Sequence, residues 1–447
     1  MTTTTSLATT QTLSSTAKTY AGWVDEAPGR GTLGLIISCL FTIFLCTWVV
    51  IHPRVCKRPL LRVLHKFALF SNAIIAPEFI AVEGLQECAQ AQRLVKDCAG
   101  LTGGGLKFVH AFYIGMLALR YRTPRGEKVI WPNQYTWLLQ QGLIDWKDHE
   151  AWSLSEETIR DKSNADGTAK LLALGQVCWF AAQSIMRRAH TLPLSQLESM
   201  TLGYIPLFAI TYLFWWVKPK DVLTPSIVDL PNMLEEQKAV FESMAVSSVF
   251  DEEGLSKQGS LWSVWYLTPR VFEKEAEDKA LEEAQRRLSP QADHTTTRGI
   301  ERALNLEDKV SSELLAAEKP PTKGIVVANW DPELYRSKIL WPITCLFGAS
   351  FGALHLISWN TEFPTLVEQW LWRAAALASI ASMLIFMQFE KVVLRWGGLL
   401  TMVSLASPIV YLLSRLVMMG GVIAAFRASD PAVYDTYVVS TYWVHVV

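Results

Sequence analysis

Long uncharged apolar runs alternate with charged stretches along this 447-residue chain. The first run, Thr32–Ile51, contains no charged residue, and a helix of its length rises about 30 Å, the thickness of the hydrocarbon core of a bilayer. Further apolar runs follow in the middle and in the last third of the chain. The pattern predicts an all-α fold, a polytopic transmembrane helical bundle of six to seven spans. The predicted spans are residues 32–51, 171–186, 202–217, 339–359, 371–389 and 399–425.

A further apolar segment, Phe67–Leu85, is interrupted by Pro77, Glu78 and Glu83. Proline interrupts the hydrogen-bond ladder of a helix, so this segment can be a kinked span, a re-entrant segment or an interfacial helix. Counting it gives seven spans, and omitting it gives six. We favour six spans with a re-entrant segment, because this count puts the basic link 391–395 on the inside.

The distribution of basic residues orients the predicted spans. Basic residues follow the first span at once, whereas few precede it, which places the N-terminus in the lumen or outside the cell. These residues are Arg54, Lys57, Arg58, Arg62 and Lys66. Arg187 and Arg188 are exceptions to the rule when six spans are counted. The first span is predicted to be a signal anchor, in the endoplasmic reticulum or another endomembrane.

Polar sections separate the predicted membrane sections. The predicted order is a disordered leader (1–31), a membrane section (32–217) that includes a membrane-surface subdomain (86–170), a hydrophilic loop (218–337) and a second membrane section (338–447). The leader is rich in Thr and Ser, and the subdomain is mixed in polarity and dotted with Trp. Within the loop, Arg270–Leu288 is predicted to be a solvated, charged helix.

Composition and charge agree with a membrane protein. Half of the residues are hydrophobic, and the formal net charge of −1 gives no indication of a nucleic-acid partner. The 18 Trp residues fit aromatic belts at the two membrane interfaces, or an aromatic cavity for an apolar ligand. The seven Cys are scattered, which argues against a disulfide framework, although Cys88 and Cys98 could form a bridge if their loop were lumenal.

Motifs for metals and nucleotides are missing from the sequence. It has no DDxxD, no Walker loop, no GxSxG, and no two His residues spaced by three or four positions. We therefore expect neither a metal nor a cofactor.

Polar residues inside the predicted spans are the candidates for chemistry. Gln176, Trp179, Gln183 and Arg187 recur at helical spacing on one face of one span, which should avoid lipid and turn toward the interior of the bundle. There they either hold helices together by hydrogen bonds or contact a substrate.

A second set of candidates lies in the span 339–359. Phe351, His355 and Trp359 share one helix face, and Gly348 and Gly352 form a GxxxG pattern that permits close helix contact. The histidine is either a hydrogen-bonded core residue or a group for proton transfer near neutral pH.

Arg415 lies near the middle of the last predicted span. A charge at that depth needs an acidic partner, a water-filled cavity or a ligand. Glu78 and Glu83 are the candidate partners, and both a functional role and simple structural pairing remain open.

Five blocks of the sequence carry a family resemblance: Gly29–Pro53, Ala76–Glu78, Gln176–Glu198, Tyr212–Val222 and His355–Ala375. Together they resemble a large family of fungal integral membrane proteins, most of which have no assigned function. The resemblance implies a fungal source and a place in secondary-metabolite (terpenoid) pathways. One implied reaction is an intramolecular Diels–Alder cyclisation of the norbornene-forming, sordarin type. The matching blocks also add Trp216 to the candidates.

These observations predict a cofactor-free enzyme that cyclises or isomerises a lipophilic terpenoid in the membrane; a transporter and a membrane scaffold are the alternatives. Its expected partners are the lipid bilayer and a lipophilic small molecule, and the sequence specifies no protein partner. The candidate catalytic residues are His355, Gln176, Gln183, Arg415 and Glu78, and the candidate substrate-binding residues are Trp179, Phe351, Trp359 and Trp216.

Overall fold

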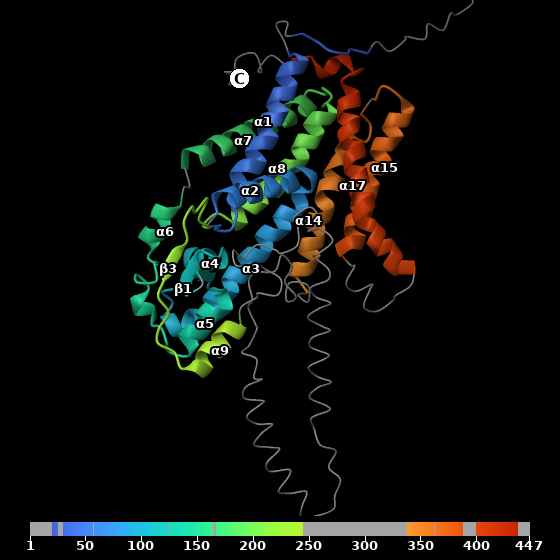
Figure 1. The fold of residues 1–447 in the computed structure, drawn as a ribbon. Coiled ribbons are helices and arrows are strands. Elements are labelled where there is room, and N and C mark those ends of the chain that lie inside the picture. Colours follow the sequence, from blue (N-terminus) through green and yellow to red (C-terminus); the bar gives the residue numbers. More distant parts are fainter. Residues whose placement is uncertain are drawn as a thin grey trace, which may run out of the picture.

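The computed structural model describes residues 20–25, 30–56, 58–124, 126–163, 167–244, 338–361, 363–387 and 399–436. Most of the predicted leader, the charged helix Arg270–Leu288 and most of the hydrophilic loop lie outside the described residues. In Figure 1, long helices form a bundle, and a smaller unit of short helices and strands lies at one end of it.

The bundle is built from long apolar helices. They are α1 (Thr32–Val50), α7 (Gly167–Ala189), α8 (Gln196–Phe214), α14 (Leu340–His355), α15 (Leu366–Met387) and α17 (Leu399–Ala425). Five segments are long and apolar enough to cross a membrane: Thr32–Val50, Gln196–Phe214, Trp341–Ser358, Leu366–Met387 and Ala406–Ala425. The described chain is therefore mostly helical, and these helices are the expected form of a membrane protein.

The predicted kinked segment is a break between two helices. α2 (Pro59–Ile75) and α3 (Pro77–Thr102) meet at Ala76 and are bent by 117°. Pro77 has no N–H to continue the ladder, and as the first residue of α3 it is well placed to begin a new helix. If this pair counts as one span, the described residues contain up to six candidate spans. The predicted upper limit of seven also includes residues 171–186, which lie in α7.

α7 contains the predicted span 171–186 but is not among the five apolar candidates. Its polar stripe and flanking basic residues lower its mean hydropathy. Its outer face is nevertheless apolar, since Leu171, Leu172 and Ile185 are 70, 71 and 67% exposed. Its inner face buries Phe180, Ser184 and Arg187 against the bundle.

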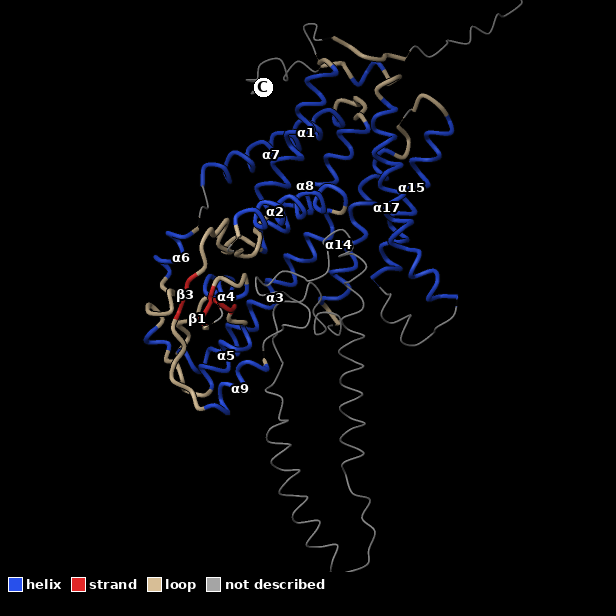
Figure 2. The backbone as a smooth tube through the Cα atoms, in the orientation of Figure 1, coloured by secondary structure: helices blue, strands red, loops and turns tan. Residues whose placement is uncertain are grey.

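The predicted all-α class is wrong in one small region. Strands β1 (Leu119–Thr123), β2 (Gly126–Val129) and β3 (Ser226–Val228) form a sheet in the order β2-β1-β3. β1 pairs antiparallel with β2 and parallel with β3, so a strand from the predicted hydrophilic loop completes a sheet begun more than 90 residues earlier. Figure 2 shows the strands in red at the left of the view, above α5 and α9.

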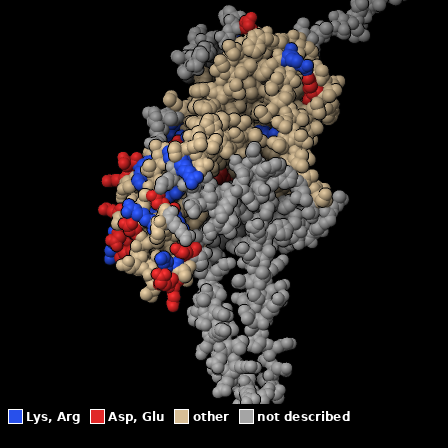
Figure 3. Space-filling model, viewed as in Figure 1, with Lys and Arg blue, Asp and Glu red and all other residues tan. Residues whose placement is uncertain are grey.

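Short helices surround this sheet and complete the unit, here called the sheet subdomain. They are α4 (Phe108–Gly115), α5 (Pro132–Gln140), η1 (Trp146–Asp148), α6 (Glu156–Lys162) and α9 (Glu235–Ser243). Phe241 of α9 is fully buried against Tyr121 and Trp137, and its carbonyl accepts a 2.7 Å hydrogen bond from Gln134. In Figure 3, most of the visible charged side chains gather over this subdomain, whereas the described face of the bundle is nearly uncharged.

All seven cysteines are free thiols, which answers the question left open for Cys88 and Cys98. Both lie on α3, ten positions apart on one helix. That separation corresponds to about 15 Å along the axis, far beyond the reach of a disulfide.

The two ends of the bundle join different parts of the chain. At one end, the segment before α1 meets the segment after α17, where Ala21 and Ser429 form a β-bridge. At the other end, Lys218 donates to the carbonyl of His52, and Lys66 pairs with Asp221. The end of α1 and the exit of α8 therefore lie beside the sheet subdomain.

Candidate functional site

The break between α2 and α3 leaves backbone carbonyls without helical donors. A carbonyl normally accepts from the N–H four residues later, but the chain turns by 117° at this point. The carbonyls of Ile74 and Ile75 therefore need other donors, since an unpaired carbonyl in an apolar bundle costs several kcal/mol.

Arg415 on α17 supplies these donors. Its Nε donates to the Ile75 carbonyl at 2.7 Å, and its Nη2 donates to the Ile74 carbonyl at 3.2 Å. The hydroxyl of Tyr204 on α8 also donates to the Ile74 carbonyl, at 2.5 Å. A guanidinium suits this position because the C-terminal end of a helix carries partial negative charge.

Glu78 lies on the other side of the break, in the first turn of α3. Its side chain is 1% exposed, and Oε1 accepts a 2.5 Å hydrogen bond from the hydroxyl of Tyr411 on α17. The same hydroxyl lies 3.3 Å from the Ile75 carbonyl, so Tyr411 and this carbonyl link Glu78 to Arg415. The predicted neighbourhood of Glu78 and Arg415 is thus present, but within the described chain the two are bridged rather than directly paired.

Aromatic rings enclose the guanidinium. Its Cζ lies 3.7 Å from the ring centroid of Phe351 on α14. That ring also contacts Tyr204 and His355, with centroid distances of 5.0 and 4.4 Å. Gly203 makes this approach feasible, because a Cβ there would lie 3.3 Å from both His355 and Phe351. The environment is apolar and closely packed, so the charge interacts strongly with its neighbours.

The orientation of His355 determines which ring nitrogen is free. Nδ1 lies 2.7 Å from the carbonyl of Phe351, which can only accept, so Nδ1 carries the hydrogen. In the neutral ring Nε2 is then a proton acceptor. His355 is fully buried, and Trp372 of α15 packs against its ring at 5.6 Å.

We call these six side chains, Glu78, Tyr204, Phe351, His355, Tyr411 and Arg415, the helix-break cluster. Three of its buried polar atoms have no partner among the described residues: Glu78 Oε2, Arg415 Nη1 and His355 Nε2. A guanidinium N–H is a group that can polarise a carbonyl oxygen, and a carboxylate oxygen or an imidazole nitrogen is one that can accept a proton. Nowhere in the described chain, this cluster included, do three His, Cys, Asp or Glu side chains come together as metal ligands would.

Four of the nine predicted site residues belong to this cluster: Glu78, Phe351, His355 and Arg415. Tyr204 and Tyr411 were missed by the sequence reasoning, which considered charged, amide, imidazole and indole groups. The signal for both was a phenol hydroxyl inside an apolar run, since a buried hydroxyl usually requires a hydrogen-bond partner.

The other predicted site residues lie away from the cluster. Gln176 donates to Thr42 of α1 at 3.2 Å, and Gln183 forms no side-chain hydrogen bond with the described residues. Trp179 is half-buried on α7. These three residues belong to α7, which packs on α1 and α8, and α8 separates it from His355 on α14.

Trp359 and Trp216 are also separate from the cluster. α14 ends at His355 and continues as the 3-10 helix η3 (Leu356–Ser358), so Trp359 does not continue the predicted helix face. Its carbonyl accepts from Arg373 at 2.9 Å, and the guanidinium lies over its ring. Trp216 is 58% exposed beside Tyr212, as expected for a residue in an interfacial belt.

Comparison with known proteins identifies a family but no activity. No curated protein and no solved structure matches the chain significantly. A family match covers three segments, residues 3–97, 149–299 and 334–445, which together make up most of the chain and include every residue of the helix-break cluster. The chain therefore belongs to the family of unknown function DUF8562.

Proposed function

We propose that this protein is an integral membrane enzyme that cyclises or isomerises a lipophilic carbonyl compound without changing its atomic composition. The observation that carries the proposal is the helix-break cluster, with three buried polar atoms that lack partners in the described chain. Such atoms are costly inside an apolar bundle, and polar groups at this depth commonly serve a function.

Arg415 is suited to polarise a carbonyl oxygen. Two of its nitrogens are held by the Ile74 and Ile75 carbonyls, so the remaining Nη1 is fixed in position. A preorganised donor in a water-poor site stabilises charge that develops on an oxygen during a reaction. In an intramolecular Diels–Alder reaction, this donor would withdraw electron density through the carbonyl while two carbon–carbon bonds form and no proton moves.

Glu78 and His355 extend the same site to proton transfer. In an isomerisation, Glu78 Oε2 would take a proton from the carbon beside the carbonyl and return it to a different carbon. His355 Nε2 is a second proton acceptor in the same cluster. We base the proposed substrate class, a terpenoid intermediate of fungal secondary metabolism, on the family resemblance alone.

The arrangement of the helices supports a topology with six crossings. α7 leads from the side of the sheet subdomain toward the end where α8 begins and runs obliquely across α1 (Figure 1). We take it as the sixth crossing beside the five apolar spans. Both ends of the described chain then lie on one side. The sheet subdomain lies on the other, together with Arg54, Arg58 and Arg62 after α1. The positive-inside rule makes that second side cytosolic and places the N-terminus in the lumen of the endoplasmic reticulum or another endomembrane.

The experiment is conversion by microsomes that contain the protein. They are supplied with linear and partly cyclised terpenoid aldehydes, and the extracts are compared by mass spectrometry. We expect a product of unchanged mass that forms only when the protein is present. Tyr411→Phe should reduce its formation at least about tenfold, because Glu78 loses its hydroxyl partner.

Tyr212→Phe is the matched control. The hydroxyl of Tyr212 forms no hydrogen bond with the described residues, and its ring lies at a distance from the cluster beside Trp216. Equal conversion by wild type, Tyr411→Phe and Arg415→Gln would contradict the proposal, because the cluster would then be irrelevant to the reaction.

Transport is the second candidate, and the broken α2–α3 pair favours it. Transporters often bind their substrates at half-helix ends in the middle of the membrane. Here Arg415 of α17 contacts the end of α2, and the first turn of α3 carries Glu78. Redistribution of the supplied compound across proteoliposome membranes, without conversion, would favour transport over catalysis.

A further inference from the structure

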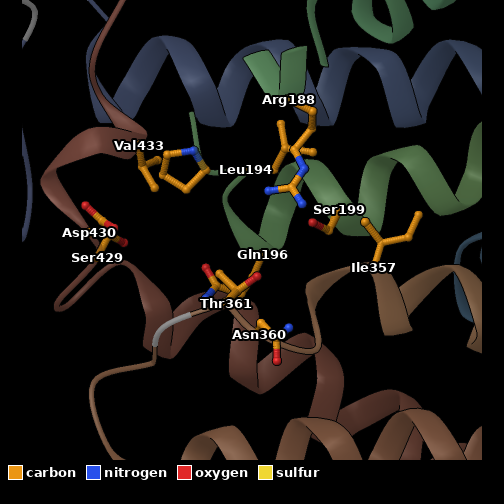
Figure 4. Close-up of a pocket in the computed structure, with 11 residues that line it drawn as sticks. Arg188, Leu194, Gln196, Ser199, Ile357, Asn360, Thr361, Ser429, Asp430 and Val433 are labelled. Carbon is orange, nitrogen blue, oxygen red and sulfur yellow. The ribbon is translucent and has the colours of Figure 1, made fainter. Parts of the chain in front are cut away.

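A cavity of about 230 Å³ lies at the end of the bundle opposite the sheet subdomain. It is formed by three links that are far apart in the chain: the α7–α8 link, the α14–α15 link and the segment after α17 (Figure 4). The lining residues that matter below are Arg188, Ser199, Ile357, Asn360, Thr361 and Asp430. It shares no residue with the helix-break cluster.

Two opposite charges face this cavity without pairing. The guanidinium of Arg188 points into it in Figure 4 and has no hydrogen-bond or ion-pair partner in the described chain. Asp430 lies on another wall, where Oδ1 accepts a 2.9 Å hydrogen bond from the Ala432 N–H. Its second carboxylate oxygen has no described partner. The cavity thus offers a cationic site and an anionic site to one ligand.

Neutral polar groups complete the lining. Ser199 on α8 is 1% exposed, yet its hydroxyl forms no hydrogen bond with any described residue. The side chains of Asn360 and Thr361 also form none there, and Figure 4 draws both beside Gln196. These side chains line the cavity, so their polar groups are available to hydrogen-bond a ligand there.

The position of the cavity indicates where such a ligand comes from. It lies at the end of the membrane helices, at the level where a bilayer has its headgroups. Ile357 on its rim is 51% exposed, and the nearby start of α15 exposes Leu366 and Val367. Acyl chains can therefore lie against apolar surface next to a cavity lined by charge.

We propose that this cavity binds the headgroup of phosphatidylethanolamine. Arg188 would bind the phosphate, with Ser199 as a further donor, and Asp430 would accept hydrogen bonds from the primary ammonium. None of the described residues that line the cavity is aromatic, so this lining offers no aromatic cage of the kind that choline prefers. The inference is independent of the enzymatic proposal, because it involves a different end of the molecule.

The test measures lipid binding to the purified full-length protein in detergent by native mass spectrometry. The probes are dioleoyl phosphatidylethanolamine, dioleoyl phosphatidylcholine and dioleoyl phosphatidylglycerol. We expect phosphatidylethanolamine to bind about tenfold more tightly than the other two, the value of one charge-assisted contact. Arg188→Gln should weaken binding of all three lipids about tenfold.

Asp430→Asn should remove only the preference for phosphatidylethanolamine, because an Asn side chain can still accept from the Ala432 N–H while the negative charge is lost. Arg427→Gln is the control for a lost charge at the same end, since Arg427 pairs with Glu368 outside the cavity. Arg427→Gln should leave the lipid preference unchanged. That result would show that loss of a charge at this end does not by itself alter lipid binding.

Three outcomes would overturn the inference. The first is equal binding of the three lipids by the wild type. The second is an Asp430→Asn variant that keeps the wild-type preference. The third is tight binding of soluble phosphoethanolamine that displaces no lipid, which would assign the cavity to a soluble phosphate ester instead.

Discussion

The Nε of Arg415 on α17 lies 2.7 Å from the carbonyl oxygen of Ile75, the last residue of α2. This contact places a cation from the last described helix over the end of a helix that begins more than 350 residues earlier. The break at Pro77 creates the need for such a donor, and the guanidinium meets it with a planar set of N–H groups. One side chain therefore joins α17 to the break between α2 and α3, and its Nη1 has no partner among the described residues.

Arg415→Leu should destabilise the bundle. Two carbonyls lose their charged donor in an apolar environment, so we expect the free energy of unfolding to fall by about 3 kcal/mol. Titration with sodium dodecyl sulfate in mixed micelles, followed by loss of helical circular dichroism, measures this change. Arg427→Leu is the control, since Arg427 is exposed at the end of the bundle and a surface pair contributes about 1 kcal/mol or less. Equal effects of the two substitutions would contradict the role given to Arg415.

Gly352→Ala should separate α14 from α15. A Cβ at Gly352 would lie 2.7 Å from the Ile380 side chain and 3.2 Å from the Ile380 backbone nitrogen, and backbone atoms cannot move aside locally. We expect a loss of about 1 to 3 kcal/mol in the same titration. Gly420→Ala, on α17, has no neighbour within 4 Å and should be neutral or slightly stabilising. If Gly352→Ala were also neutral, α14 and α15 would not pack as closely at Gly352 as described.

That glycine contact was predictable from the sequence, whereas other parts of the fold were not. Two local patterns could be interpreted directly. The GxxxG spacing of Gly348 and Gly352 permits close helix contact, and the central position of Arg415 requires polar surroundings. The partners of Arg415 were not visible, because they are backbone carbonyls that become acceptors only when the helix breaks. β3 has three residues, too few for any alternation to appear, and its pairing with β1 is long-range. Cavities built from links depend on how the links meet, which no periodicity encodes.

Gly203→Val should impair conversion more than folding. The added side chain would collide with His355 and Phe351, which lie 3.3 Å from the position of a Cβ, and would displace both from Arg415. We expect product formation in the microsomal assay to fall about tenfold or more. Gly175→Val on the exposed face of α7 has open space around it and should retain wild-type conversion. Full conversion by Gly203→Val at normal protein levels would show that His355 takes no part in the reaction.

His110 in the sheet subdomain should make stability depend on pH. Burial lowers its pKa from 6.5 to about 4, and the carboxylate of Glu156 opposes this only in part. The unfolded chain therefore binds a proton near pH 6.5 that the folded protein refuses until about pH 4. Neutral His110 therefore costs the folded protein nothing above pH 6.5, and the free energy of unfolding falls as the pH decreases from 6.5 toward 4.

His110→Gln should flatten this pH dependence. The Nδ1 of His110 accepts a 2.9 Å hydrogen bond from the Lys107 N–H, and Gln134 and Gln237 make the same bond at the starts of α5 and α9. Gln thus keeps the cap and removes the titration. Thermal melting of wild type and variant between pH 7.5 and 4 is the measurement. Parallel melting curves would show that His110 does not titrate as expected.

The proposed topology predicts which added glycosylation site is used. Ala8→Asn creates Asn-Thr-Thr in the N-terminal segment, and Glu156→Asn creates Asn-Glu-Thr at the exposed start of α6. With the N-terminus lumenal and the sheet subdomain cytosolic, only the first should be glycosylated and show a glycosidase-sensitive shift in mass. Each variant is the control for the other, because the native sequence has no acceptor site. Modification of the Glu156→Asn variant alone would invert the topology. Modification of both variants would mean that the chain crosses the membrane an even number of times between the N-terminal segment and the sheet subdomain, instead of once.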